Sequence, residues 1–249
     1  MNRYEIKRIA ANFWEDVGKP EPFPRSLEPA VYWALPLGVF KLPRLWVSDV
    51  QVWLAEQGIQ FELETEDRAL HGCLIARQGR GCVFLSGTDS DAELRFSLAH
   101  EVAHFLLDYH LPRQSAVNRL GPSVLEVFDG LRPATIQERV DAVLSQTSVG
   151  FHTHLMERNS TGVLGCSTVG VLEENADRLA LELLAPEKEA RRRVTLAFRS
   201  APASDHIQIA NHVLQIEFGL PPSIAQLYGR RLFQSTPIYS IRDWLQQRS

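Results

Sequence analysis

The most informative stretch of this sequence is RFSLAHEVAHFLLDYH, from Arg95 to His110. It contains HEVAH, in which His100 and His104 stand four residues apart within a largely apolar run. Side chains four residues apart share one face of an α-helix, so both imidazoles can bind the same metal ion. Glu101 projects about 100° away from His100 and can reach a metal-bound water without binding the metal itself. The pattern predicts a zinc site with His100 and His104 as ligands and Glu101 as general base.

The alternative is an ordinary helix that carries two surface histidines. The apolar neighbours argue against it, because two imidazoles and a carboxylate left unpaired on a buried helix would cost on the order of several kcal/mol. A bound metal would remove that cost. A catalytic zinc ion also needs a third protein ligand and an open fourth position, so the rest of the chain must supply one more donor.

The start of this helix is marked by capping residues. Ser90 and Glu93 fit an S-x-x-E capping box, and Asp91 suits the positive end of the helix dipole. We expect the helix to run to about Asp108, with Pro112 beyond its end.

Upstream of this helix the hydrophobic pattern changes to that of strands. Residues 59–65 alternate, and residues 71–77 and 81–87 flank a QGR turn that is typical of a hairpin. We expect a small, mainly antiparallel sheet, with strand 81–87 as a candidate to pair with an extended substrate.

Helical periodicity predicts most of the remaining elements. The proline-rich residues 20–43 are expected to dock on the core as short helical turns, and residues 162–170 to form a loop. Helices are expected at residues 3–17, 46–57, 135–149 and 171–187, and two more within 205–234, on either side of a turn at residues 218–220. Together these elements predict an α+β fold.

The bulk composition limits the classes of protein. A length of 249 residues allows one large domain, alone or with a small appendage. A net charge of -4 and a pI of about 6.1 argue against a strongly basic nucleic-acid-binding protein. No apolar run approaches the roughly 20 residues that span a membrane, and no signal peptide is evident. The three cysteines (Cys73, Cys82 and Cys166) are expected to be free thiols, so we expect a cytoplasmic protein.

The best candidate for the third ligand is Glu173, within EENADRLALELLAPE. Asp177 lies four residues later on the same helical face, so one carboxylate could bind zinc while the other accepts a hydrogen bond from a ligand imidazole. This E-x-x-x-D arrangement resembles the gluzincin peptidases of the thermolysin type. Glu174 is the rival ligand, but it lies one step round the helix and lacks such a partner four residues on. A solvated acidic face at the helix N-terminus is the plainer alternative.

Two further patterns could carry function. His152 and His154, in FHTHL, would lie on one side of a strand and could form a second metal site, although an exposed polar strand is the interpretation we favour. The two C-terminal helices could form a DNA-binding helix-turn-helix. Positive charge there would come from Arg230, Arg231 and residues 191–193, but we favour a packing or substrate-recognition role.

Three stretches together resemble the ImmA/IrrE family of metallopeptidases. RFSLAHEVAHFLL is similar to the family's R-F-S/T-x-A-H-E-x-x-H-x-x-L block. EENADRLALELLAPE is similar to its E-x-x-A-N/D-x-F/L-A-x-x-L-L-x-P block, and FGLPPSIAQLYGRRL to its helical tail. The stretches cover roughly a fifth of the chain and occur in the family's order.

The resemblance implies a zincin-like metallopeptidase with one Zn²⁺ per chain. His100, His104 and Glu173 would be its ligands, Glu101 its base, and Asp177 the residue that orients a ligand imidazole. Its protein substrate would be a helix-turn-helix repressor of the Xre type, whose cleavage derepresses stress or mobile-element genes. The peptidase domain would occupy residues 1–195, followed by a helical, helix-turn-helix-like subdomain at 196–249.

The chain departs from the family pattern at two points. Glu173 follows His104 by 69 positions, a longer gap than the family leads us to expect, so an insertion at about 110–165 must loop out and return. Leu179 stands where Phe is more usual, which is a mild packing change.

Two other functions compete with this prediction. A non-catalytic regulator could keep the zincin fold and bind a repressor or DNA through its C-terminal helices. An aminopeptidase-like enzyme could act on small peptides. No membrane partner is expected, and the sequence leaves the oligomeric state open.

Overall fold

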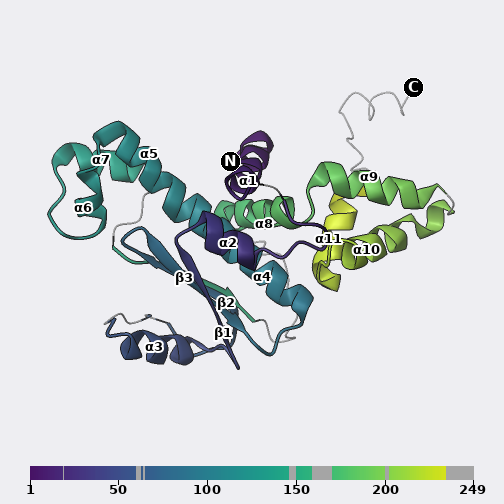
Figure 1. Ribbon diagram of the computed structural model, residues 1–249, viewed down its shortest axis with the longest axis horizontal. Coiled ribbons are helices and arrows are strands. Elements are labelled where there is room, and N and C mark those ends of the chain that lie inside the picture. The colour runs from purple at the N-terminus through teal and green to yellow at the C-terminus, as the bar shows by residue number, and fades with distance from the viewer. Residues whose placement is uncertain are drawn as a thin grey trace, which may run out of the picture.

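A four-stranded sheet lies in the middle of the molecule, with helices on both of its faces (Figure 1). The computed structural model describes residues 1–18, 20–59, 63, 65–145, 150–158, 170–199 and 202–233. Its strands follow the order β1-β3-β2-β4, with β1 parallel to β3 and β2 antiparallel to both β3 and β4. The strands are β1 (Leu37–Leu42), β2 (Leu70–Arg77), β3 (Arg80–Ser86) and β4 (His152–Glu157). The expected α+β fold with a mainly antiparallel sheet is confirmed.

A two-residue turn joins β2 to β3. Its residues, Gln78 and Gly79, have φ values of 51° and 77°. Positive φ at both positions is the geometry of a type I′ turn, which matches the right-handed twist of the strands it joins. The hairpin predicted from the QGR sequence is therefore confirmed.

The first strand was not predicted. Residues 20–43 contain α2 (Glu28–Ala34), a short helix of the expected kind, but also β1, where only helical turns were expected. β1 pairs with β3, about 44 positions further on, so no local sequence pattern predicts this strand. In the predicted strand 59–65, residues 59, 63 and 65 lie outside any strand, and the rest of that segment lies outside the described residues.

The HEVAH helix is longer than predicted. α4 (Asp91–His104) begins at the expected capping box, where Ser90 Oγ accepts from the Glu93 N–H and the Glu93 carboxylate accepts from the Ser90 N–H. It continues through the π-helical segment η1 (Phe105–His110) into α5 (Leu111–Leu120). The predicted end at Asp108 is wrong because the chain stays helical through η1, and Pro112 lies in the first turn of α5 instead of beyond the helix.

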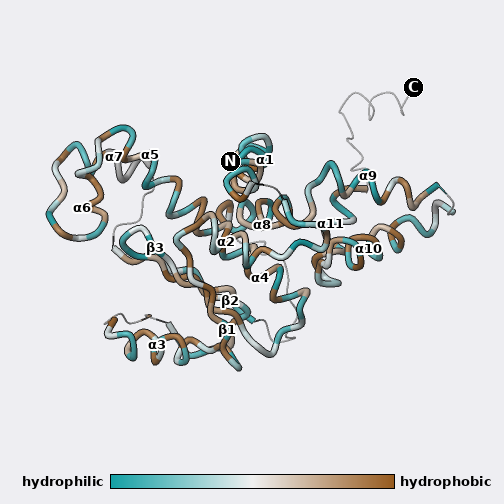
Figure 2. Tube along the Cα trace, in the orientation of Figure 1, coloured by the Kyte–Doolittle hydropathy of each residue, from teal (hydrophilic) through white to brown (hydrophobic). Residues whose placement is uncertain are grey.

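Two apolar cores hold the helices to the sheet. α3 (Val47–Glu56) packs on one face through Val50 and Leu54, and α4 packs on the other. α8 (Val171–Leu184) lies beside α4, and α1 (Arg3–Asp16) contacts α8. Figure 2 shows hydrophobic residues concentrated along the strands and along α4. The packing buries every residue of α4 from Phe96 to His104.

The insertion forms an arm that projects beyond the sheet and then returns to it (Figure 1). It comprises α5, α6 (Val124–Phe128) and α7 (Ile136–Ser145), and a small cluster of Ala116, Val124 and Phe128 holds it together. α7 matches the helix predicted at 135–149 over the described residues. The chain returns as β4, so the insertion contributes a strand to the central sheet. The loop predicted at 162–170 lies outside the described residues except for its last position.

In the described part of the chain, three helices follow α8. They are α9 (Glu187–Phe198), α10 (His206–Ile216) and α11 (Pro222–Phe233), with a short 3₁₀ turn, η2 (Ala203–Asp205), before α10. The predicted helix pair and its turn at residues 218–220 are present, and Arg95 Nη1 donates to the Gly219 carbonyl over 2.9 Å. Leu214 and Ile224 belong to the same core as α4 and α8. The expected boundary at residue 196 falls inside α9.

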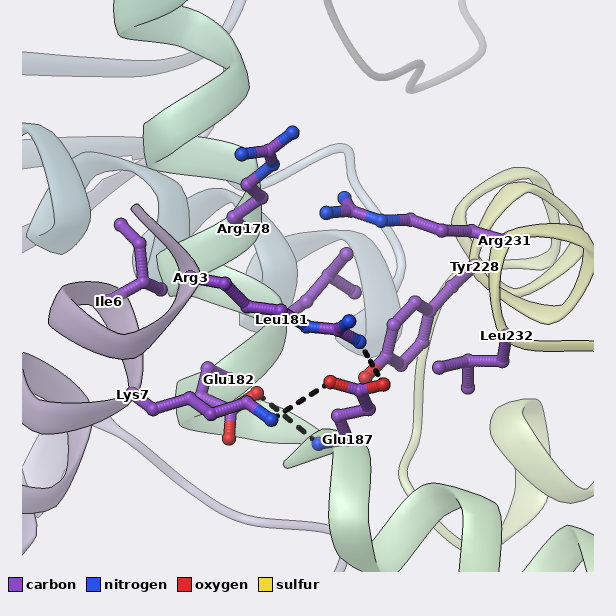
Figure 3. Close-up of a pocket in the computed structure, with 10 residues that line it drawn as sticks. All are labelled: Arg3, Ile6, Lys7, Arg178, Leu181, Glu182, Glu187, Tyr228, Arg231 and Leu232. Carbon is purple, nitrogen blue, oxygen red and sulfur yellow. Dashed lines mark hydrogen bonds and ion pairs between the residues drawn. The ribbon is translucent and has the colours of Figure 1, made fainter. Parts of the chain in front are cut away.

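Ion pairs link residues that line a small pocket where α1, α8, α9 and α11 meet (Figure 3). Lys7 Nζ lies 2.9 Å from the Glu187 carboxylate, which also pairs with Arg3 and accepts from Arg191. Burial opposes ionisation of Glu187, but its bonds to Lys7, Arg191 and Arg3 outweigh burial and lower its pKa to about 2. These contacts tie the N-terminal helix to α9.

Among the described helices, none is long and apolar enough to cross a membrane.

Candidate metal centre

Two imidazoles of α4 face each other inside the molecule. His100 Nε2 lies 3.1 Å from His104 Nε2, and each residue is 2% exposed. The four-residue spacing places both rings on the helix face that looks toward α8. Two buried imidazole nitrogens this close need a proton or a cation between them.

α8 brings Glu173 to the same point. Its carboxylate oxygens lie 3.5 Å from His100 Nε2 and 3.5 Å from His104 Nε2. The neighbouring Glu174 is more than half exposed and pairs with Arg178 on the same helix. Of the two rival carboxylates, the structure therefore brings Glu173 to the histidines and leaves Glu174 outside.

Each histidine of HEVAH has a carboxylate behind it. His100 Nδ1 lies 3.0 Å from Asp177 Oδ1, and His104 Nδ1 lies 2.7 Å from Asp108 Oδ2. A carboxylate on Nδ1 holds the ring so that Nε2 points at the centre, as is usual for metal-binding histidines. Asp177 is the carboxylate that we expected to accept a hydrogen bond from a ligand imidazole, and in the structure it faces His100 Nδ1. Asp108 was missed, although it follows His104 by four positions.

A third imidazole enters from β4. His154 Nε2 lies 3.2 Å from Glu173 Oε1, and its ring stacks on that of His104 with centroids 3.6 Å apart. Its side chain is 14% exposed, so the expected exposed strand is wrong at this position. Only the pairing of β4 with β2 brings it here. His152 lies outside this group, with its ring 5.9 Å from that of Tyr109.

Glu101 is completely buried beside the histidines. Its Oε2 lies 2.9 Å from His154 Nδ1, whereas Oε1 has no hydrogen-bond partner within the described part of the chain. Gly72 on β2 makes room for it, since a Cβ there would stand 2.9 Å from Oε1. An unpartnered buried carboxylate oxygen is costly unless another group satisfies it.

The charges of these groups are strongly coupled. Burial alone would lower the pKa of His100, but Asp177 and Glu173 outweigh it and raise that pKa to about 9. Burial likewise opposes the charged form of His154, whose pKa rises to about 10 because of Glu101 and Glu173. The three histidines in turn hold the pKa of Glu173 well below its usual range. The carboxylates thus favour positive charge at the centre.

These residues fit a zinc ion. Tetrahedral zinc with Zn–N distances near 2.0–2.1 Å would separate its donors by about 3.3 Å. Four separations among these donor atoms, 3.1, 3.2, 3.5 and 3.5 Å, are close to that value, and all the donor atoms lie within 4.8 Å of one another. Within the described residues, this is the cluster of ionisable side chains whose donor atoms could hold a metal: His100, His104, His154 and Glu173.

A cavity of about 560 Å³ opens onto this centre. Its lining includes His104, His154 and Glu173, so a ligand in it would contact the donors directly. β3 lies between β1 and β2, so both of its edges are paired and the prediction that it binds an extended substrate is wrong. β4 is the edge strand beside the centre.

Comparison with protein-family models gives a match. Residues 56–123 match the peptidase family model described as the IrrE N-terminal-like domain. That segment contains β2, β3 and the whole HEVAH helix. Comparison with curated proteins and with solved structures gives no match. This match, with the HEVAH motif within it, supports membership of the ImmA/IrrE family of peptidases over that part of the chain.

Proposed function

We propose that this protein is a zinc-dependent endopeptidase that hydrolyses a peptide bond in a protein substrate. The convergence of His100 Nε2, His104 Nε2 and the Glu173 carboxylate, with Glu101 beside them, carries the proposal. These are the residue types of a catalytic zinc site with its general base. The family match supports the same class of chemistry.

Each residue of the site has a separate role in the proposed hydrolysis. Zinc, when bound, lowers the pKa of water and polarises the scissile carbonyl. Glu101 takes the proton from the attacking water and delivers it to the leaving amine. Asp177 and Asp108 hold the imidazoles of His100 and His104 in position. The apolar packing around Glu101 keeps bulk water away from the carboxylate.

We infer that the substrate is a helix-turn-helix repressor of the Xre type, acted on in the cytoplasm. The resemblance of three sequence blocks to the ImmA/IrrE family supports this choice. Direct DNA binding by the C-terminal helices has less support, because three of the five arginines expected to supply positive charge there are engaged by carboxylates. Arg191 pairs with Glu187, Arg192 with Glu189, and Arg193 with Glu189 and Glu217.

The test compares zinc-loaded wild type with Glu101→Gln. Each is added to a lysate of the source cells, and newly formed protein N-termini are labelled and identified by mass spectrometry. We expect new N-termini within a helix-turn-helix repressor for wild type and none for the variant, with zinc content equal in both. Equal products from both proteins would reject Glu101 as the base.

A non-catalytic regulator is the competing function, and one observation favours it. Glu101 is bound to His154 and is not free to act as a base in this structure. If Glu101→Gln retains the biological effect of wild type while binding zinc normally, regulation by binding is the function and the peptidase proposal falls.

A further inference from the structure

The three histidines at this centre share one arrangement. In each ring Nδ1 faces a carboxylate, which is Asp177 for His100, Asp108 for His104 and Glu101 for His154. In each ring the other nitrogen, Nε2, lies within 3.5 Å of the Glu173 carboxylate. One donor atom from each of the four residues lies within 4.8 Å of the others. His154 therefore has the same kinds of hydrogen-bond partners as the two histidines of the HEVAH motif.

We propose that His154 is a fourth protein ligand of the metal, and that it holds the enzyme in a closed resting state. This inference rests on the proposed function. Zinc in proteins is most often four-coordinate, and a catalytic site keeps one position open for water or substrate. With His154 added to His100, His104 and Glu173, protein donors fill all four positions.

The side chain of His154 also forms a hydrogen bond with Glu101, the proposed general base. His154 Nδ1 lies 2.9 Å from Glu101 Oε2, while His154 Nε2 lies 3.2 Å from Glu173 Oε1. One imidazole therefore bridges the base and the third ligand. If the His154 imidazole moved away, one coordination position of the metal would open and Glu101 would become free to act as a base. Hydrolysis needs both, so one displacement would provide both.

The element that carries His154 is suited to such a displacement. Within the described part of the chain, β4 pairs on one side with β2, and its other edge has no strand partner. The C-terminal end of the strand is held to the sheet, because Arg158 pairs with Asp89, which also bonds His71. The displacement therefore involves the part of β4 before Arg158, which includes His154. An edge strand with one neighbour is easier to shift than a central strand, because fewer ladder hydrogen bonds must break.

A different role for the same residue makes the opposite prediction. His154 could donate a hydrogen bond to the oxyanion of the transition state, as positioned donors do in other hydrolases. It would then lie near an open metal position without binding the metal. Removing it would lower activity and leave the coordination of the metal unchanged.

The first measurement is zinc X-ray absorption on the wild-type full chain, which counts imidazole ligands directly. Three imidazoles and one carboxylate are expected for the closed state, and two imidazoles with a water ligand would overturn the inference. This measurement depends on no variant being folded. If the wild-type chain binds no zinc, the proposed function itself fails, which is a distinct result.

The second measurement asks whether a coordination position is open. Cobalt-loaded wild type, His154→Ala and His154→Gln are titrated with acetohydroxamate, and the visible cobalt bands report its binding. We expect the variants to bind the probe at least tenfold more tightly than wild type, and to cleave substrate faster. His152→Ala, on the same side of β4 but outside the donor group, is the control and should behave as wild type. Equal probe binding by wild type and variants would reject His154 as a ligand.

Discussion

Asp177 Oδ1 and His100 Nδ1 lie 3.0 Å apart, and this contact turns His100 Nε2 toward Glu173. Asp177→Asn removes the charge while keeping the size of the side chain. Such supporting carboxylates typically contribute about 10–100-fold to metal affinity, so we expect zinc to bind the variant more weakly by about that factor. Competition with a fluorescent zinc chelator measures it. Unchanged affinity would show that His100 needs no such partner.

Glu173 and Glu174 form a matched pair for testing the third ligand. Glu173→Gln should reduce the zinc content of the purified protein sharply, because it removes a charged donor from the centre. Glu174→Gln should leave the zinc content unchanged, because this exposed carboxylate pairs with Arg178 instead. Elemental analysis of the zinc content of both variants shows which of the two glutamates is the ligand. Equal zinc loss in the two variants would contradict the placement of Glu173.

Gly72 is expected to control the orientation of Glu101. In Gly72→Ala the new methyl group would stand 2.9 Å from Glu101 Oε1, so the carboxylate must move. We expect peptide hydrolysis to fall at least tenfold while zinc content stays the same, because Glu101 is not a ligand. Gly81→Ala is the control: its methyl group meets Leu37, so it should lower stability without lowering the turnover number. Full turnover by Gly72→Ala would mean that Glu101 has room to adjust.

Glu187 should make stability depend on pH. Its pKa of about 2 in the folded protein lies below the usual value of 4.5, so its contribution is present above about pH 4.5 and is lost as pH falls toward 2. We expect Glu187→Gln to lower the free energy of unfolding by roughly 1–2 kcal/mol at pH 7, because its partners Arg3 and Lys7 are largely solvent-exposed.

The difference in the free energy of unfolding between wild type and Glu187→Gln should become smaller below pH 4.5. Urea unfolding at pH 7 and pH 3 measures it, with Glu126→Gln as a control at an exposed carboxylate that pairs with Arg132. A gap that stays constant from pH 7 to pH 3 would show that the Glu187 ion pairs do not stabilise the fold.

Much of the candidate metal centre could be predicted because its parts are local in the sequence. His100, Glu101 and His104 lie on one helix, and Glu173 and Asp177 lie on another at the same four-residue spacing. Helical geometry alone decides which of these side chains share a face. Asp108 obeys the same rule relative to His104, so the sequence contained that signal as well.

The remaining parts depended on contacts between distant segments. β1 exists because it pairs with β3, and the insertion returns to the sheet because β4 pairs with β2. An alternating H-T-H segment is equally compatible with an exposed strand and with a buried one, so the position of His154 was not readable from its own sequence.

The sequence by itself determined a helix that must bury two imidazoles and a carboxylate, a second helix with acidic side chains on one face, and the hairpin between β2 and β3. Period and spacing specify these features because each involves residues close along the chain. The tertiary structure alone decided that His154 joins the donors and binds Glu101, because strand pairing across 80 positions brings them together.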